Sequence, residues 1–342
     1  MFQTEPIIYL QSHGTQCITN HMIQITQMGS SSFLVPIIII AIFGVDFKKG
    51  FLLFQLFLWT TLFTETLKIL VGFPRPYFLD NRVMNLEDGI KNISPFTGNR
   101  IKSIFSLPDK QILTQFRLHE AFKPDSFGCP SGHMSRATAL WGGIATVFNT
   151  RILKILTPFV IVLMAFSRLY LGKHFIGDVL GGTIVGLVSL VVFAYLLKSP
   201  LKNNFFKKKN FELAFRRQNL FFHGFMFVIP IVFLALSLIK SDTLGYFFGV
   251  NVADLLIIRK GIPDDIGNIE QRATRAFIAL LLFEVSQIIL GCWFGTAGMT
   301  NYLQFTNQEI GFLKTFIPVS TIWVSVVICK QLNLYLINEG SL

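Results

Sequence analysis

The chain has 342 residues, of which 52% are hydrophobic and 14% are charged, and its formal net charge is +11. An ordinary soluble domain carries about 25% charged residues, so this composition excludes a typical water-soluble protein and favours a membrane protein. Most basic residues lie between hydrophobic runs, which is typical of membrane topology and lipid contact, so we expect membrane lipids and no nucleic acid as partners.

The first 32 residues mix polar and apolar side chains. They contain no Lys or Arg, and the first basic residue is Lys48, so the basic region of a cleavable signal is missing. The segment 1–32 is expected either to lie on the membrane surface as a helix or to pack as an ordinary terminus.

Apolar runs of spanning length follow along the rest of the chain. They predict about nine spans, near residues 33–45, 51–73, 130–148, 152–169, 175–197, 220–239, 244–258, 276–295 and 310–329. The run at 244–258 is the weak candidate. Because a spanning backbone must satisfy its own hydrogen bonds, the expected fold class is an all-α, polytopic transmembrane helical bundle.

Basic residues concentrate in alternate loops, which predicts that those loops are cytoplasmic. They are Lys48, Lys49, Arg151, Lys154, the run from Lys198 to Arg217, Arg259, Lys260, Arg272 and Arg275. This pattern favours a crossing at 244–258 and places the N-terminus outside. The loop 75–128, with eight basic and six acidic residues, fits the pattern poorly.

Three divisions of the chain are predicted. Residues 1–198 form a membrane domain with the polar motifs described below, 199–219 a basic cytoplasmic linker, and 220–342 a C-terminal helical extension.

Glycines four residues apart in the fifth span, at 177 and 181 and at 182 and 186, predict close helix packing in lipid. The four cysteines have no metal or redox spacing and are interpreted as small buried side chains.

The first polar motif closes the second span. Lys68 lies near the end of this span, and Arg75 follows between Pro74 and Pro76, which fix the backbone and end the helix. A lysine point charge and an arginine fork suit a phosphate. The alternative is a lysine that reaches the interface and an ordinary loop arginine.

The second polar motif, Pro130-Ser131-Gly132-His133, opens the third span. Free backbone N–H groups at a helix start, together with a hydroxyl and a glycine, predict an anion-binding site. His133 could transfer a proton near neutral pH. The alternative is a capped helix with an interfacial histidine.

The third polar motif runs from Ser167 to Asp178 and includes Arg168 and His174. His174 and Asp178 are four residues apart at the start of the fifth span, so they share one helix face. A carboxylate that fixes one imidazole nitrogen leaves the other free as a nucleophile. An interfacial ion pair is the alternative, although such charges at a membrane edge are costly without a function.

These three motifs match, in order and without substitution, those of the type 2 phosphatidic acid phosphatase superfamily, which the chain resembles from Lys68 to Asp178. The resemblance implies that His174 attacks phosphorus and forms a phosphohistidine, that Asp178 orients His174, and that His133 protonates the leaving oxygen. It also implies a set of phosphate-binding residues, namely Lys68, Arg75, Ser131, Gly132 and Arg168. No cofactor or metal is expected, since cations and N–H donors meet the phosphoryl charge.

The predicted function is that of an integral membrane phosphatase which hydrolyses a phosphomonoester or diphosphate of a lipid such as phosphatidate, undecaprenyl diphosphate or a sphingoid phosphate. The motifs fall at predicted outward-facing helix ends, so the active site is expected at the outer or lumenal face of the membrane. The alternatives are a glucose-6-phosphatase-like sugar phosphatase, a lipid phosphotransferase and a transporter. Transport is considered because Asp254, Glu284 and Gln287 lie in or near spans.

Overall fold

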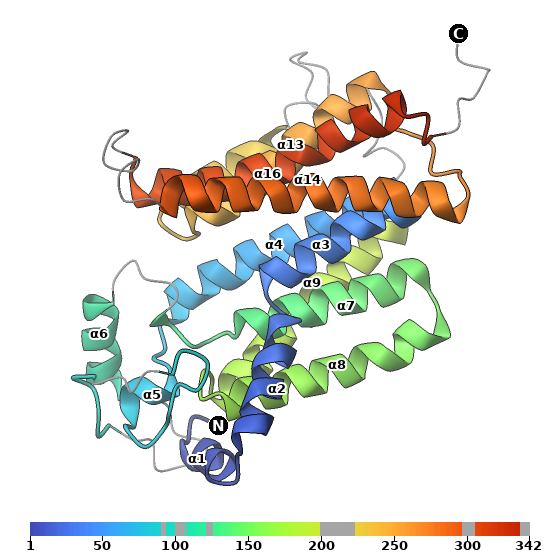
Figure 1. The fold of residues 1–342 in the computed structure, drawn as a ribbon. Coiled ribbons are helices and arrows are strands. Elements are labelled where there is room, and N and C mark those ends of the chain that lie inside the picture. Colours follow the sequence, from blue (N-terminus) through green and yellow to red (C-terminus); the bar gives the residue numbers. More distant parts are fainter. Residues whose placement is uncertain are drawn as a thin grey trace. The chain divides into compact units, whose positions relative to one another are not determined.

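The protein is described here from a computed structural model, which covers residues 1–89, 94–99, 107, 109–120, 126–198, 223–295 and 305–335 (Figure 1). Helices dominate, and an isolated bridge pairs Pro74 with Phe127. The predicted all-α class is therefore confirmed. The predicted basic linker at 199–219 lies outside the described residues.

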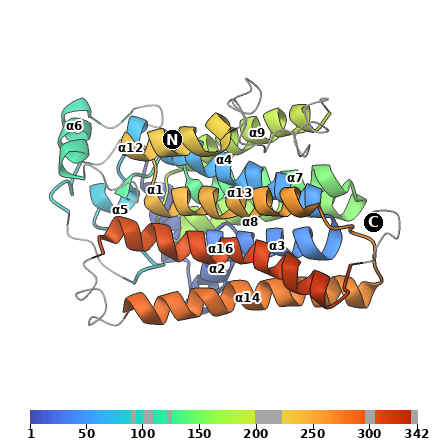
Figure 2. The same cartoon turned by 90° about the horizontal axis from the view of Figure 1, so that it is seen from above.

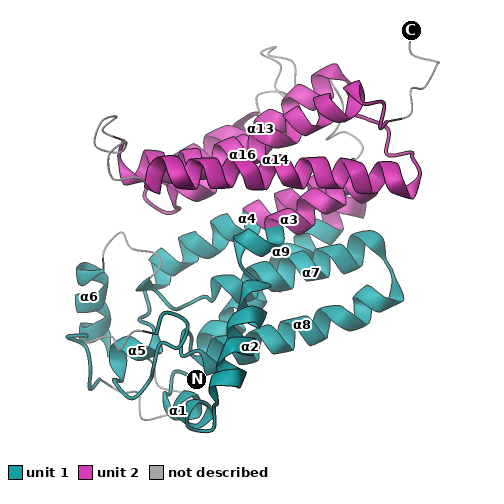
Figure 3. Ribbon diagram, viewed as in Figure 1, with its two compact units in different colours: residues 1–34, 59–194 teal, residues 35–58, 195–342 magenta. Residues whose placement is uncertain are grey.

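The chain forms two compact units, one made of residues 1–34 and 59–194 and the other of residues 35–58 and 195–342 (Figure 3). Helix α4 (Phe47–Val71) contributes its first half to the second unit and its second half to the first. The predicted functional division at residues 198 and 219 stays a prediction.

The first unit contains all three polar motifs. Its helices, besides the second half of α4, are α1 (Glu5–Ser12), α2 (Gln16–Gln27), α5 (Pro76–Leu79), α6 (Lys110–His119), α7 (Gly132–Phe148), α8 (Arg151–Tyr170) and most of α9 (Ile176–Lys198). Helices α7 and α8 lie side by side as a hairpin (Figure 1). The turn between them forms because Asn149 adopts a left-handed conformation, with φ of 52°, and the Thr150 hydroxyl accepts a hydrogen bond from the N–H of Leu153. This hairpin brings the end of α8 back to the beginning of α7.

Glycines allow α9 to approach α7 closely. A Cβ atom added at Gly186 would lie 2.7 Å from the carbonyl oxygen of Ser135, and one added at Gly182 would collide with the carbonyl oxygen of Ser131. Larger side chains at these positions would therefore separate the two helices. The close packing predicted from the glycine spacing is found, and it holds the start of α9 against the start of α7.

The N-terminal segment packs onto the first unit. Helices α1 and α2 contact α8. The Phe2 ring makes edge contacts with the rings of Phe73 and Phe175, at centroid separations of 5.3 and 5.7 Å. These contacts link the terminus to two of the polar motifs. The segment 1–32 is thus packed against the rest of this unit, and a position at the membrane surface stays a prediction.

The second unit is a helical assembly. Besides the first half of α4, its elements are most of α3 (Ser31–Ile40), the π-helical turns η1 (Ala41–Val45) and η4 (Gly224–Val228), α12 (Ile229–Ala235), α13 (Ser241–Lys260), α14 (Ile269–Gly295) and α16 (Asn307–Gln331). Helix α16 packs along both α13 and α14 (Figure 2). Buried polar contacts link α4, α13 and η4: the amide of Gln55 donates to Asn251 at 2.7 Å, and the amide of Asn251 donates to the Met226 carbonyl at 2.9 Å.

Within the described part of the chain, six helices are long and apolar enough to cross a membrane, namely α4, α8, α9, α13, α14 and α16. A bent pair, residues 16–27 and 31–45, makes a seventh if it is counted as one span. The weak candidate at 244–258 lies in α13 and qualifies. Helix α7 and the helix at 224–235 are too short by the same measure, so the predicted number of nine is not confirmed. The chain is an integral membrane protein with several apolar helices.

Two of the four cysteines do not fit the expectation of buried side chains. Cys329 is buried and Cys129 is partly buried, whereas Cys17 and Cys292 are exposed. Cys292 lies on α14, one of the six apolar helices, where an exposed side chain can face lipid.

Candidate active site

The three polar motifs converge in the first unit. The loop that precedes the second motif pairs with the first, because the Gly128 N–H donates to the carbonyl oxygen of Phe73 at 2.7 Å. The second motif joins the third through the Ser131 N–H, which donates to the carbonyl oxygen of Asp178 at 2.9 Å. Backbone contacts therefore fix the relative positions of three segments that are far apart in the sequence.

His174 and Asp178 form a buried pair at the start of α9. The Nδ1 atom of His174 lies 3.4 Å from Oδ2 of Asp178, slightly longer than an ordinary hydrogen bond. The same Oδ2 accepts a hydrogen bond from the N–H of Phe175 at 2.9 Å, which fixes the carboxylate in the first turn. The other ring nitrogen of His174, Nε2, does not face the carboxylate.

The environment of His174 favours the neutral imidazole. The residue is 1% exposed, and burial lowers the pKa of His174 well below its usual value of 6.5. The positive charges of Arg75, Arg168 and Lys68 lower this pKa further. A neutral imidazole has a free lone pair, which a nucleophile requires.

The start of α7 presents unused hydrogen-bond donors. The Ser131 hydroxyl does not cap the helix, and this buried oxygen has no hydrogen-bond partner among the described residues. A Cβ added at Gly132 would lie 3.8 Å from the nearest guanidinium nitrogen, Nη1 of Arg136, so the backbone here is open. A hydroxyl and N–H groups at a helix start are suited to an anion.

Three buried cations stand near the His174–Asp178 pair. Lys68 lies in the last turn of α4, Arg75 directly precedes α5, and Arg168 lies in the last turn of α8. Within the described ranges, the Nε atoms of Arg75 and Arg168 have no hydrogen-bond partner. Unused guanidinium donors at buried positions fit a ligand with several oxygens.

A cavity of about 380 Å³ opens beside these cations. Its lining residues are Arg75, Tyr77, Phe78, Glu87, Asp88, Ser126, His133, Arg168 and Lys173. Arg75, His133 and Arg168 are the predicted site residues on this wall. The other predicted residues, Lys68, Ser131, Gly132, His174 and Asp178, do not line the cavity, although the positive charge of Lys68 acts on His174.

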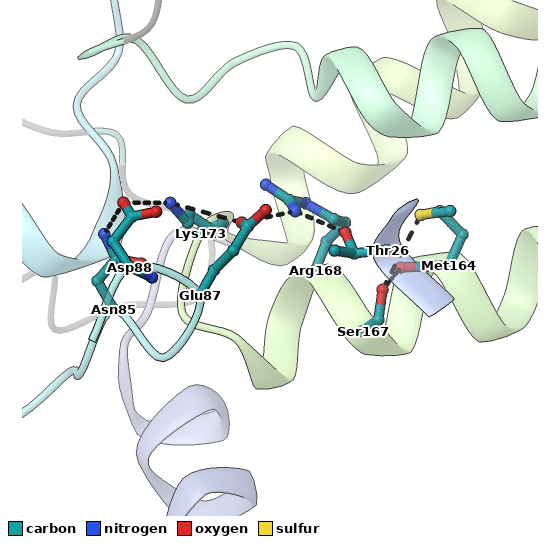
Figure 4. A network of polar contacts seen from close by, with 8 residues as sticks. All are labelled: Thr26, Asn85, Glu87, Asp88, Met164, Ser167, Arg168 and Lys173. Atoms are coloured by element: carbon teal, nitrogen blue, oxygen red, sulfur yellow. Dashed lines mark hydrogen bonds and ion pairs between the residues drawn. The ribbon is translucent and has the colours of Figure 1, made fainter. Parts of the chain in front are cut away.

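The sequence interpretation missed an acidic pair and a lysine at this cavity (Figure 4). Glu87 Oε2 lies 3.1 Å from Nη1 of Arg168 and 3.4 Å from Nζ of Lys173, and Asp88 Oδ2 lies 2.7 Å from Nζ of Lys173. Burial would raise the pKa of Asp88, but hydrogen bonds from Lys173 and Asn85 outweigh it and lower that pKa. Lys173 directly precedes His174 in the sequence, which is the one signal that pointed to it.

Cys129 also lies beside the second motif. Burial and the neighbouring charge of Asp178 raise the pKa of the Cys129 thiol to about 12. This side chain is therefore a neutral thiol at physiological pH and not a nucleophile.

The polar residues behind the transport alternative lie in the second unit. Asp254 on α13 is 1% exposed, and within the described part of the chain neither of its carboxylate oxygens has a hydrogen-bond partner. Glu284 on α14 is exposed. Transport stays a prediction.

Comparison with known proteins agrees with the motifs. Residues 49–200 match the PAP2 superfamily, a range that contains all three motifs. Phosphatidylglycerophosphatase B of Bacillus subtilis (strain 168) is 29% identical over 178 residues, which cover 49% of this chain and 69% of that protein. The crystal structure of a transmembrane PAP2-type phosphatidylglycerolphosphate phosphatase from Bacillus subtilis covers 57% of this chain and 84% of its own, with a TM-score of 0.40 and 22% identity.

The apolar helices, the converging motifs and the family match together define the class: an integral membrane protein with a phosphatase domain. The match of residues 49–200 to the PAP2 superfamily confirms the resemblance noted from the sequence.

Proposed function

We propose that the chain hydrolyses the terminal phosphate of a lipid phosphate through a phosphohistidine intermediate at His174. The observation that carries this proposal is the buried His174–Asp178 pair, 3.4 Å apart, beside three cations and the cavity that His133 lines. A carboxylate, a neutral imidazole and fixed positive charges are the groups that phosphoryl transfer to nitrogen needs.

The first step forms a bond between Nε2 of His174 and phosphorus and breaks the bond from phosphorus to the lipid oxygen. The leaving oxygen receives a proton from His133. The carboxylate of Asp178 lies 3.4 Å from Nδ1 of His174, so it balances the positive charge that develops on the ring. In the second step, water attacks phosphorus, His133 takes the proton of that water, and the bond from nitrogen to phosphorus breaks.

The phosphoryl oxygens gain negative charge during both steps. Lys68, Arg75 and Arg168 supply three positive charges around the pair, and the unused hydroxyl of Ser131 with the N–H of Gly132 supplies neutral donors. These groups are buried, so their interaction with the phosphoryl group is stronger than it would be in water. We therefore propose that the reaction needs no metal ion.

A lipid is the proposed source of the phosphate. The motif residues sit at the ends of the apolar helices α4, α8 and α9, where a bilayer places its headgroups, and Tyr77 and Phe78 give the cavity an apolar wall. The relative named phosphatidylglycerophosphatase B supports a glycerophospholipid bearing a terminal phosphate. The charge pattern of the loops supports an active site at the outer or lumenal face of the membrane.

The test is phosphate release by the purified protein in detergent. Substrates are phosphatidylglycerol phosphate, phosphatidate, undecaprenyl diphosphate and glucose 6-phosphate, compared between wild type and His174→Ala. A matched control is His13→Ala, because His13 is exposed and its Nδ1 contacts only nearby residues of its own helix region. We expect lipid phosphates to be hydrolysed, His174→Ala to be inactive and His13→Ala to match wild type. Phosphate release by His174→Ala at the wild-type rate would refute the mechanism.

A further inference from the structure

The acidic pair at the cavity is held in place by the surrounding backbone. The Leu86 N–H donates to the carbonyl oxygen of Leu171 at 3.2 Å, and the side chain of Gln11 bonds both the N–H and the carbonyl oxygen of Met84. Asn85 donates to Asp88 at 2.7 Å. Glu87 is thus carried into the cavity wall by a fixed turn that other parts of the first unit support.

Glu87 contacts a group predicted to bind phosphate. Its Oε2 atom lies 3.1 Å from Nη1 of Arg168, and the same guanidinium nitrogen donates to the Thr26 hydroxyl at 2.6 Å (Figure 4). The Arg168 side chain is 2% exposed and that of Glu87 is 20% exposed. The carboxylate therefore provides the negative charge that a buried arginine needs.

Lys173 extends this arrangement. Its Nζ atom lies 3.4 Å from the same Oε2 atom of Glu87, so one carboxylate oxygen is shared between two cations on the cavity wall. An incoming anion that binds Arg168 must compete with this oxygen. Its advantage over Glu87 depends on how much negative charge it brings.

The two kinds of lipid headgroup differ in that charge. A phosphodiester carries one negative charge, the same as the carboxylate that it would have to displace. A terminal phosphate carries about 1.5 to 2 negative charges near pH 7 and presents three oxygens. The glycerophospholipids of the surrounding bilayer are phosphodiesters. A site whose cations had no carboxylate beside them would bind these phosphodiesters as well.

We propose that Glu87 is a specificity-determining residue that reserves Arg168 for doubly charged terminal phosphates by competing with singly charged phosphodiester headgroups. This inference rests on the proposed function, since it assigns selectivity to the same site. Glu87 acts through Arg168 and Lys173 and takes no part in bond making or breaking.

The experiment measures competitive inhibition of short-chain phosphatidate hydrolysis by two probes. Short-chain phosphatidylglycerol is the singly charged phosphodiester, and inorganic phosphate is the probe that reaches a double charge. In Glu87→Gln we expect the inhibition constant of phosphatidylglycerol to fall by at least about tenfold and that of phosphate by only about threefold. The ratio of the phosphatidylglycerol constant to the phosphate constant should therefore become smaller than in wild type.

The matched control is Asp88→Asn. Asp88 belongs to the same turn, contacts Lys173 and not Arg168, and its side chain is 48% exposed. Neutralising it should leave the ratio of the two inhibition constants within about threefold of wild type, because exposed charges act weakly. An equal change of the ratio in both variants would overturn the specific role of Glu87.

Melting temperatures of all variants are measured first. If Glu87→Gln does not fold, Glu87→Ala replaces it and is interpreted in the same way. Failure of both to fold, while Asp88→Asn folds, would overturn the proposal in favour of a structural role. The proposed function is tested separately by comparing hydrolysis by wild type with hydrolysis by His174→Ala, which should be inactive. If that control holds and Glu87→Gln leaves the ratio of inhibition constants unchanged, only the inference about Glu87 fails.

Discussion

Replacing Asp178 by asparagine should lower the catalytic rate without lowering the stability of the fold. Asp178 is completely buried, with Oδ2 held by the N–H of Phe175 at 2.9 Å and placed 3.4 Å from Nδ1 of His174. Asparagine has the same size but carries no charge, and it can offer an N–H group to Nδ1. His174 would then be free to adopt the wrong tautomer, and the positive charge formed on its ring would have no counter-charge.

The magnitude follows from comparable carboxylate–histidine pairs. Loss of the orienting carboxylate lowers kcat by up to about 10⁴-fold, and a range of about 10²- to 10⁴-fold corresponds to about 3–5 kcal/mol of transition-state stabilisation. The free energy of unfolding should rise or stay unchanged, because burying a negative charge costs more free energy than burying an amide. Asp178→Asn should therefore be nearly inactive with an unchanged or higher melting temperature.

The assay combines steady-state phosphate release with thermal unfolding of the same preparation in detergent. Asp88→Asn serves as the control for the chemical change itself, since it makes the same substitution on the partly exposed cavity wall. A kcat within about tenfold of wild type for Asp178→Asn would refute the orienting role of this carboxylate. Inactivity accompanied by a large fall in melting temperature would show that Asp178 acts on the fold.

Three further predictions follow from the same site. Ser131→Ala should lower kcat/KM by about 10- to 100-fold without lowering the melting temperature, because the buried hydroxyl has no hydrogen-bond partner among the described residues and a bond to a charged group contributes about 1.5–3 kcal/mol. In an NMR titration of histidine-labelled protein, with the His174 signal assigned from His174→Asn, His174 should be neutral from pH 7.5 to 6.5. Burial and the nearby cations lower its pKa, so the ring takes up its second proton only as pH falls below 6.5. A titration midpoint of His174 at pH 6.5 or above would contradict this prediction. Treatment with EDTA should leave phosphate release unchanged because Lys68, Arg75 and Arg168 meet the phosphoryl charge, and loss of activity that Mg²⁺ restores would show that this reasoning is wrong.

The apolar runs predicted the helices well because a bilayer imposes a simple rule on length and polarity. Helices α4, α8, α9, α14 and α16 fall close to their predicted ranges. The number of spans was harder to predict, because the rule does not distinguish a full crossing from a short helix such as α7. The break between residues 16–27 and 31–45, which are bent by 51°, also leaves no clear mark in an apolar run.

The candidate site shows a different limit. His174 and Asp178 were paired from their spacing, because residues four apart on a helix face the same way. Glu87 could not be placed in this manner, since it lies 81 residues from Arg168 along the chain, in a polar loop that has no periodic pattern. Its position depends on contacts with Leu171 and Gln11, which only the folded chain brings together.

Trapping the phosphoenzyme tests the central mechanism most directly. The protein is mixed with ³²P-labelled phosphatidate, quenched in alkali, in which phosphohistidine survives, and digested for peptide mapping. The mechanism predicts label on the peptide that contains His174 and no label in His174→Ala. It also predicts that label accumulates in His133→Ala when the substrate is a ³²P-labelled aryl phosphate, whose phenolate leaving group needs no proton. Rapid hydrolysis by wild type with no label on His174 at any time would contradict a covalent intermediate at this residue.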